Sequence, residues 1–91
     1  MTLAWTIDYT DTARRALRKM DKHSARQIVE YLTDRIGAAD NPHDFGKPLK
    51  GPLGDYWRYR VGDYRIICEI HESAVRVLVV DVGHRREVYK R

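Results

Sequence analysis

Residues 56–70, YWRYRVGDYRIICEI, place three arginines around one tight turn. The Gly-Asp pair at 62–63 is typical of a two-residue hairpin loop, and such a loop sets Arg60 directly opposite Arg65. Directly paired residues share a face of a sheet, so Arg58, Arg60 and Arg65 are expected to point the same way. Like charges opposite one another repel, and such a local conflict is more typical of a binding site than of a plain surface.

An anion with several oxygens, such as a phosphodiester, would relieve this repulsion through charge-assisted hydrogen bonds. The alternative is a solvated face on which the arginines pair with acidic residues, namely Asp55, Glu69 or Asp81. The hairpin by itself leaves these two interpretations nearly balanced.

The end of the chain adds residue types that suit metal-free phosphodiester cleavage. After the apolar run VLVVDV come His84, Arg85, Arg86 and Tyr89. Arginine stabilises charge that builds on a phosphate, histidine moves protons near neutral pH, and a tyrosine hydroxyl can orient an attacking sugar hydroxyl or exchange a proton with it. Because the last strand is expected to return beside the central strand, these side chains can reach the arginines. A basic terminus by itself is more often a solvated tail.

Length and composition limit the possibilities further. The 91 residues suffice for one domain, residues 1–91, with a modest core, and the net charge of +4 favours nucleic acid or an acidic protein as partner. The single cysteine, Cys68, excludes an internal disulfide framework and a cysteine-based zinc site. No apolar run is long enough to cross a membrane and no secretory signal is evident, so we expect a cytoplasmic protein.

Hydrophobic periodicity predicts the order strand, helix, helix, strand, strand, strand. We expect an α+β fold in which two N-terminal helices pack on one face of a four-stranded, mainly antiparallel sheet (β-α-α-β-β-β), followed by a short C-terminal tail. The predicted strands cover residues 3–9 and about 55–61, 63–71 and 74–82, the helices lie within 10–21 and 23–37, and residues 38–54 are expected to form a loop.

With these motifs in place, the whole chain resembles the RelE family of bacterial type II toxins, within the wider RelE/ParE group. The resemblance rests on PLKGPLGDYWRYRVGDYRIICEI followed by VLVVDVGHRREVY. In this pattern basic residues alternate on one strand, G-x-Y-R and an apolar strand follow, and V-G-[KH]-R and a tyrosine close the chain. It covers nearly all 91 residues.

The resemblance implies a ribosome-dependent endoribonuclease that enters the ribosomal A site and cuts the mRNA codon there. The implied chemistry is attack of the ribose 2′-hydroxyl on the adjacent phosphate, without a metal or another cofactor. The implied partners are a RelB-like antitoxin that wraps the toxin in a hetero-oligomer, the 70S ribosome, mRNA and rRNA.

The resemblance also implies roles for individual residues. Arg58 and Arg60 match the two alternating basic strand positions. Arg65 matches the arginine expected to hold the scissile phosphate, and Arg85 the arginine expected to assist the transition state or the leaving oxygen. Tyr89 matches a tyrosine expected to stack on or orient the nucleotide and to help activate the 2′-hydroxyl.

One departure from the family pattern concerns the general base. The alternating strand positions are often lysine in the best-known members, whereas here Arg58 and Arg60 occupy both. Arginine stays protonated in proteins and is a poor base. His84, at a position where members have lysine or histidine, and Tyr89 are then the better candidates, or the two arginines act only electrostatically.

Basic residues elsewhere fit an rRNA footprint as a set, although each alone is more simply a solvated side chain: Arg14, Arg15, Arg18, Lys19, Lys22, Arg26, Lys47, Lys50 and Arg86. Two alternatives stay open. One is a ParE-like toxin that inhibits DNA gyrase without cutting RNA, and the other is a non-toxic basic domain that binds RNA or an acidic protein. The combination of Arg65, Arg85 and Tyr89 favours the RelE-like hypothesis, because ParE-type members do not need it.

Overall fold

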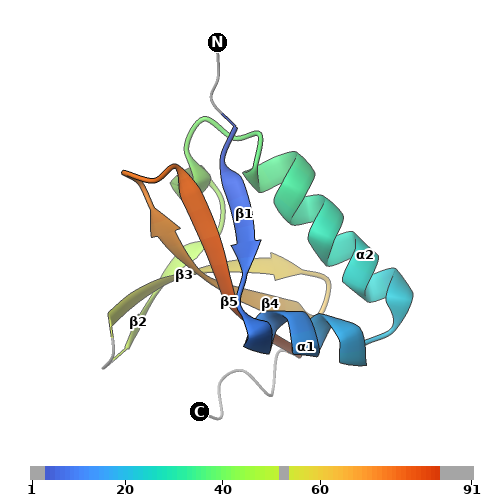
Figure 1. Cartoon of the computed structure of the whole chain (residues 1–91). Helices are drawn as coiled ribbons and strands as arrows, with labels where there is room; N and C mark the ends of the chain where they lie inside the picture. Colours follow the sequence, from blue (N-terminus) through green and yellow to red (C-terminus); the bar gives the residue numbers. More distant parts are fainter. Residues whose placement is uncertain (1–3, 52–53, 85–91) are drawn as a thin grey trace.

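The computed structural model describes residues 4–51 and 54–84. Five strands form one sheet in the order β1-β5-β4-β3-β2, and the helices lie together on one side of it (Figure 1). β1 runs parallel to β5, and the other neighbours are antiparallel. The elements are β1 (Thr6–Tyr9), α1 (Asp11–Lys19), α2 (Lys22–Glu30), the π-helical turn η1 (Tyr31–Ile36), the 3-10 turn η2 (Pro42–Asp44), β2 (Lys47–Gly51), β3 (Gly54–Val61), β4 (Tyr64–His71) and β5 (Arg76–His84).

The expected α+β fold with two helices on one face is confirmed, but the expected four strands are wrong. The fifth strand, β2, lies inside the segment 38–54 that was predicted to be a loop. Its sequence, KPLKG, contains a proline and a glycine and lacks an alternating apolar pattern. A strand of this kind is tolerated at the edge of a sheet, where proline removes no hydrogen bond between central strands, and β2 is an edge strand.

The chain reaches β2 through a loop that packs on the helix side of β3. The Tyr59 hydroxyl donates a hydrogen bond to the Pro42 carbonyl oxygen at 2.8 Å, and the Trp57 indole N–H donates to the Phe45 carbonyl oxygen. Gly46 follows with φ +71°, and a Cβ at this position would collide with the Arg58 carbonyl oxygen. The loop thus fixes where β2 meets β3.

The core lies between the helices and the covered face of the sheet. Tyr59 and Ile66 are fully buried there, as expected from their alternation with the arginines. Burial raises the pKa of the Tyr59 hydroxyl and of the Cys68 thiol, so both stay neutral. The other fully buried apolar side chains among the described residues are Ala13, Ile28, Leu32, Ile36, Pro42, Val77 and Val79. Among residues 4–51 and 54–84, no helix combines the length and the apolar composition that a bilayer crossing requires.

β5 contains a bulge that ties its second half to α1. Cys68 pairs with Val79 but Ile67 pairs with Asp81, so Val80 is an extra residue. The Thr10 hydroxyl donates to the Val80 carbonyl oxygen at 2.9 Å and accepts the Ala13 N–H at 3.1 Å, which caps α1. The hydroxyl therefore holds the bulge and the start of α1 together. Bulges redirect side chains, and this one lies just before the strand end that flanks the hairpin.

Gly46→Ala is expected to lower the free energy of unfolding by more than Gly62→Ala. Both glycines have positive φ, 71° and 58°, which costs other residues about 1–2 kcal/mol. Only Gly46 has backbone in the way of an added Cβ, because the space at Gly62 is open. Urea unfolding followed by tryptophan fluorescence measures both losses, and equal losses would contradict the tight contact between this loop and β3.

The Cys68 thiol is expected to be unreactive in the folded protein at pH 8. It is fully buried, and its raised pKa removes the thiolate that thiol reagents attack. Labelling with a thiol-specific chromogenic reagent should proceed no faster than unfolding, and should become rapid in denaturant. Complete labelling of the native protein within the mixing time would contradict this placement of β4.

Candidate functional site

The hairpin between β3 and β4 has the predicted register. Val61 pairs with Tyr64 and Arg60 with Arg65, while Arg58 pairs with Ile67. On the other side of β3, Lys47 of β2 pairs with Arg58. Because paired residues share a face, Lys47, Arg58, Arg60 and Arg65 all lie on the side of the sheet away from the helices. We call these four residues the cationic face.

Arg65 is the most buried member of the cationic face. It is only 5% exposed on the central strand β4, where it lies between Arg60 on β3 and Gly83 on β5. Arginine is seldom buried to this extent, and a buried charge requires balancing by polar or anionic groups. A small cavity of about 60 Å³ opens beside it, lined by Arg60, Gly62, Asp63, Tyr64 and Arg65. The cavity brings two guanidinium groups together, with Asp63 also in the lining, and we predict that it binds an anionic group.

Two carboxylates of the same face, Glu69 and Asp8, lie toward β1. Glu69 accepts a hydrogen bond from the His71 ring at 2.9 Å, and the Arg76 guanidinium contacts the other ring nitrogen of His71 at 3.1 Å. Arg76 also lies 3.8 Å from the Asp8 carboxylate. Asp55, which sequence offered as a partner for the arginines, pairs with Lys50 and points to the opposite face. The β1 side of this face therefore has mixed charge, whereas the β2 and β3 side has cations only. Asp81 of β5 also points to this face, in the same row as Ile67 and Arg58.

The structure does not place His84 with the arginines. His84 pairs with Tyr64 on the helix side of the sheet, with the two rings 5.8 Å apart in an edge-to-face arrangement. The bulge at Val80 is the reason, because one extra residue moves every later side chain of β5 to the other face. Arg85, Arg86 and Tyr89, which sequence also assigned to the site, lie outside the described residues.

The basic residues predicted to contact rRNA do not form one surface. Lys47 joins the cationic face, whereas Lys50, three residues on, points to the opposite side of β2. Arg14, Arg18 and Lys22 are exposed on α1 and at the start of α2, on the helix side of the sheet.

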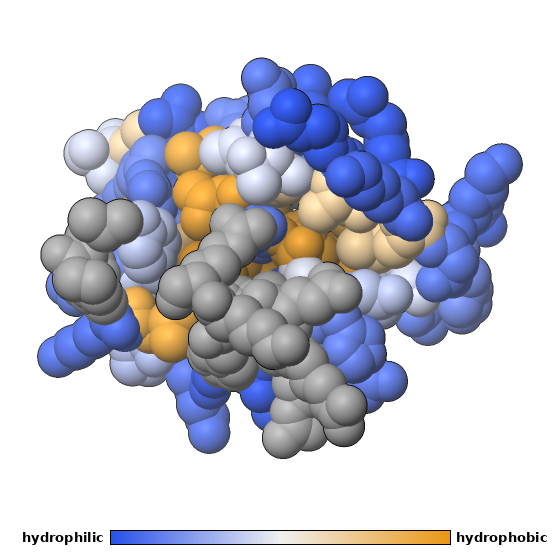
Figure 2. All heavy atoms as spheres, turned by 90° about the horizontal axis from the view of Figure 1, so that it is seen from below, coloured by the Kyte–Doolittle hydropathy of each residue, from blue (hydrophilic) through white to orange (hydrophobic). Residues whose placement is uncertain are grey.

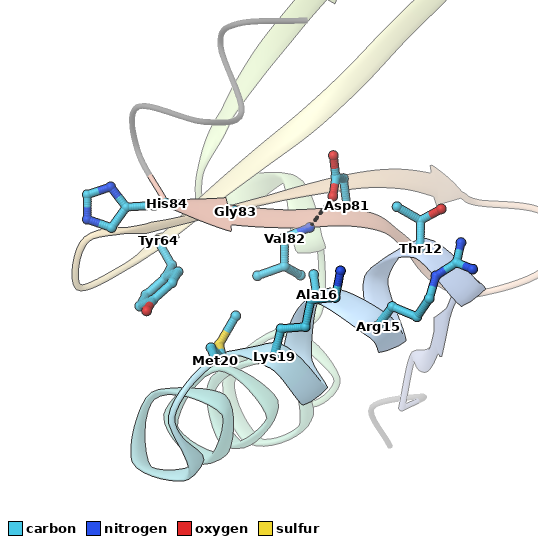
Figure 3. A pocket seen from close by; sticks show the side chains of 10 residues that line it. All are labelled: Thr12, Arg15, Ala16, Lys19, Met20, Tyr64, Asp81, Val82, Gly83 and His84. Carbon is cyan, nitrogen blue, oxygen red and sulfur yellow. Dashed lines mark hydrogen bonds between the residues drawn. The ribbon is translucent and has the colours of Figure 1, made fainter.

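A larger cavity that the sequence did not indicate lies where β5 runs past the end of β1. It has a volume of about 560 Å³ and is lined by Thr12, Arg15, Ala16, Lys19, Met20, Tyr64, Asp81, Val82, Gly83 and His84. Figure 3 shows Val82 pointing toward α1 and Asp81 pointing to the other side of the strand, where its carboxylate accepts the Val82 N–H at 2.9 Å. In the view from below, patches of apolar surface are visible among hydrophilic residues (Figure 2).

Comparison with known proteins identifies the family. Residues 7–89 match the family described as the ParE toxin of type II toxin–antitoxin system, parDE. The chain is 30% identical over 89 residues to toxin RelG of Mycobacterium tuberculosis, covering 98% of this chain and 100% of that protein. The chain belongs to the RelE/ParE superfamily of type II toxins. Toxin RelE of the same organism is 32% identical over 84 residues, covering 92% of this chain and 84% of that protein.

Solved structures of RelE/ParE toxins share the fold. The TM-score is 0.82 to a chain of the toxin–antitoxin complex RelBE2 from M. tuberculosis, at 29% identity, covering 96% of this chain and 98% of that one. The archaeal RelE–RelB complex from Pyrococcus horikoshii has a TM-score of 0.73 at 22% identity, covering 92% and 98%. The isolated Escherichia coli RelE toxin has a TM-score of 0.70 at 23% identity, covering 96% and 93%. The predicted resemblance to this group of toxins is confirmed.

Arg60→Gln is expected to raise the free energy of unfolding by up to about 1 kcal/mol at low ionic strength, because it removes the repulsion against Arg65. The gain should shrink as salt screens the two charges. Added phosphate should raise the thermal midpoint of the wild type more than that of Arg60→Gln, because phosphate bound between two arginines stabilises the folded state.

Lys50→Gln is the matched control for Arg60→Gln, because Lys50 pairs with Asp55 and its removal takes away an attraction. It should leave stability unchanged or lower it slightly. An Arg60→Gln variant that is no more stable than the wild type, and that responds equally to phosphate, would contradict the anion site.

Proposed function

We propose that this toxin is a ribosome-dependent endoribonuclease that cuts mRNA in the ribosomal A site by metal-free attack of the 2′-hydroxyl. The observation that carries the proposal is the hairpin register, which brings Arg58, Arg60 and Arg65 together on the uncovered side of the sheet. The proposal is further supported by relatives at 30% and 32% identity that are named toxin RelG and toxin RelE.

In the proposed reaction the 2′-oxygen forms a bond to the adjacent phosphorus while the bond from phosphorus to the 5′-oxygen breaks. The 2′-hydroxyl loses its proton and the leaving 5′-oxygen gains one. Arg65 would hold the scissile phosphate, and Arg58 and Arg60 would stabilise the charge that builds on it. Arg85 is proposed to assist the leaving oxygen.

Proton transfer needs a group other than arginine, because guanidinium groups stay protonated in proteins. Tyr89 and His84 are the candidates. His84 lies at the end of β5 on the opposite face from Arg65, so it would act only on a nucleotide that passes around the strand end. This placement makes Tyr89 the stronger candidate for activating the 2′-hydroxyl.

The proposed partners are a RelB-like antitoxin in a toxin–antitoxin hetero-oligomer, the 70S ribosome, mRNA and rRNA, all in the cytoplasm. Support for the antitoxin comes from structural neighbours that were solved as RelE–RelB complexes. The exposed cations Arg14, Arg18, Lys22 and Lys50, with Arg86 of the tail, are proposed to contact rRNA. The four described cations are distributed over the helix side and the edge of the sheet, which suits a protein enclosed by RNA on several sides.

A second candidate function is inhibition of DNA gyrase without RNA cleavage. The observation that favours it is the matched family description, which names the ParE toxin. A gyrase inhibitor would have no need of two arginines that line a cavity of about 60 Å³. The RelE and RelG names of the relatives also favour the nuclease.

Arg65→Ala and Arg85→Ala are each expected to reduce mRNA cleavage by about 10²–10³-fold, the usual loss when one donor to a charged transition state is removed. The measurement is in vitro translation with purified protein, followed by mapping of mRNA 3′ ends. Arg35→Ala, which removes an exposed cation from η1, is the charge-matched control and should cut normally. Circular dichroism checks that Arg65→Ala is folded.

Cuts within A-site codons that disappear without ribosomes would support the nuclease. Intact mRNA in the presence of folded wild-type protein would refute it, and a gyrase supercoiling assay would then test the second candidate. Cleavage by Arg65→Ala and Arg85→Ala at the wild-type rate would refute the assigned roles while leaving the activity itself in place.

A further inference from the structure

We infer that the cationic face continues into a nucleobase-stacking subsite at Tyr56, so that single-stranded RNA held at Arg60 and Arg65 runs along β3 toward β2. This inference rests on the proposed function, because it assumes that the cationic face binds RNA. It adds the path that the RNA strand follows and a residue that stacks on a base instead of contacting a phosphate.

The register places the relevant side chains in successive rows across the same face. The first row contains Arg60 and Arg65, the second contains Arg58 with Lys47, and the third contains Tyr56 with Leu49. Alternate residues of a strand are about 6.7 Å apart, so the rows follow one another at even steps along β3. An extended nucleic-acid strand that lies along β3 would meet two pairs of cations and then an aromatic ring.

Tyr56 differs from the other tyrosines in the part of the chain that the structure describes. Tyr9, Tyr31, Tyr59 and Tyr64 all belong to or pack against the core on the helix side of the sheet, whereas Tyr56 does not. It is half-buried on the uncovered side, opposite Leu49 of β2. An aromatic ring supported by an apolar neighbour and reached through a row of cations is the arrangement with which proteins bind single-stranded RNA, stacking a base on the ring and contacting the backbone with the cations.

The distribution of charge decides the direction of the path. Toward β1 the face presents the carboxylates of Asp81 on β5, Glu69 on β4 and Asp8 on β1. Arg76 lies 3.8 Å from the Asp8 carboxylate, and the His71 ring is hydrogen-bonded to Glu69. Phosphates would be repelled there, and the cations of that region are already engaged with these acids. Toward β2 the strand meets Arg58 and Lys47 instead. From Arg65 the RNA therefore passes over β3 toward β2, and not over β5 toward β1.

Equilibrium binding of a short 2′-O-methyl RNA, labelled at one end and followed by fluorescence anisotropy at low salt, tests the subsite. The 2′-O-methyl group removes the nucleophile, so binding is measured without cleavage. Tyr56→Ala should weaken binding by about 5- to 150-fold, the range that corresponds to one base stacked on an aromatic ring. Tyr56→Phe and Tyr56→Trp should bind like the wild type, because both keep the ring face.

Charge variants test the path. Lys47→Ala should weaken binding and reduce the slope of log K against log salt by about 0.7, as expected for one lost phosphate contact on a single strand. Arg35→Ala, which removes an exposed cation on the helix side, should change neither quantity.

The outcomes separate this inference from the proposed function. If Tyr56→Ala binds like the wild type while Arg65→Ala loses binding, the subsite is wrong and the RNA-binding face stands. If Tyr56→Phe loses as much as Tyr56→Ala, the hydroxyl acts and stacking is refuted. If the wild type does not bind, the inference fails, and the in vitro translation assay alone decides whether the protein cuts mRNA.

Discussion

The register of the β3–β4 hairpin is the constraint on which the rest of the site depends. A two-residue turn at Gly62–Asp63 sets Arg60 against Arg65 and sends Tyr59 and Ile66 to the opposite side. Because side chains alternate along a strand, a slip of one residue would bury the arginines against the helices and expose the core. The burial of Tyr59 and Ile66 makes that slip costly, so the apolar face fixes the position of the charged one.

This division lets the sheet carry a repulsive pair of charges without losing its fold. The interactions that hold β3 and β4 to the helices involve Tyr59, Ile66 and Cys68, none of which touches the uncovered side. Arg65 lies on the central strand β4, on the opposite face from this core, and is only 5% exposed. Electrostatic strain on one side of the sheet is therefore offset by burial on the other, and changes to the arginines should affect binding more than folding.

The sequence predicts the hairpin well and the strands around it less well. Turn residues and alternation specify Gly62–Asp63 and the three arginines locally, so no distant contact is needed to find them. The sequence does not predict β2, because Pro48 and its flanking residues have no strand pattern and become a strand only through pairing with β3. Regular alternation along β5 predicts His84 on the arginine side, because the sequence does not reveal that Val80 is an extra residue in the strand. The bulge is held by Thr10, 70 residues away, and contacts of that range are not visible in a local pattern.

β2 forms one edge of the sheet, and its residues determine whether that edge can pair with another molecule. An edge strand exposes backbone groups that can pair with a second molecule, and a flat apolar edge favours fibres. At this edge Pro48 has no N–H to donate. Lys47 and Lys50 lie on either side of it, and their charges would face those of an identical edge. Two copies of this toxin are therefore discouraged from joining edge to edge. The same short strand that extends the cationic face with Lys47 thus also opposes pairing of this edge with a second copy.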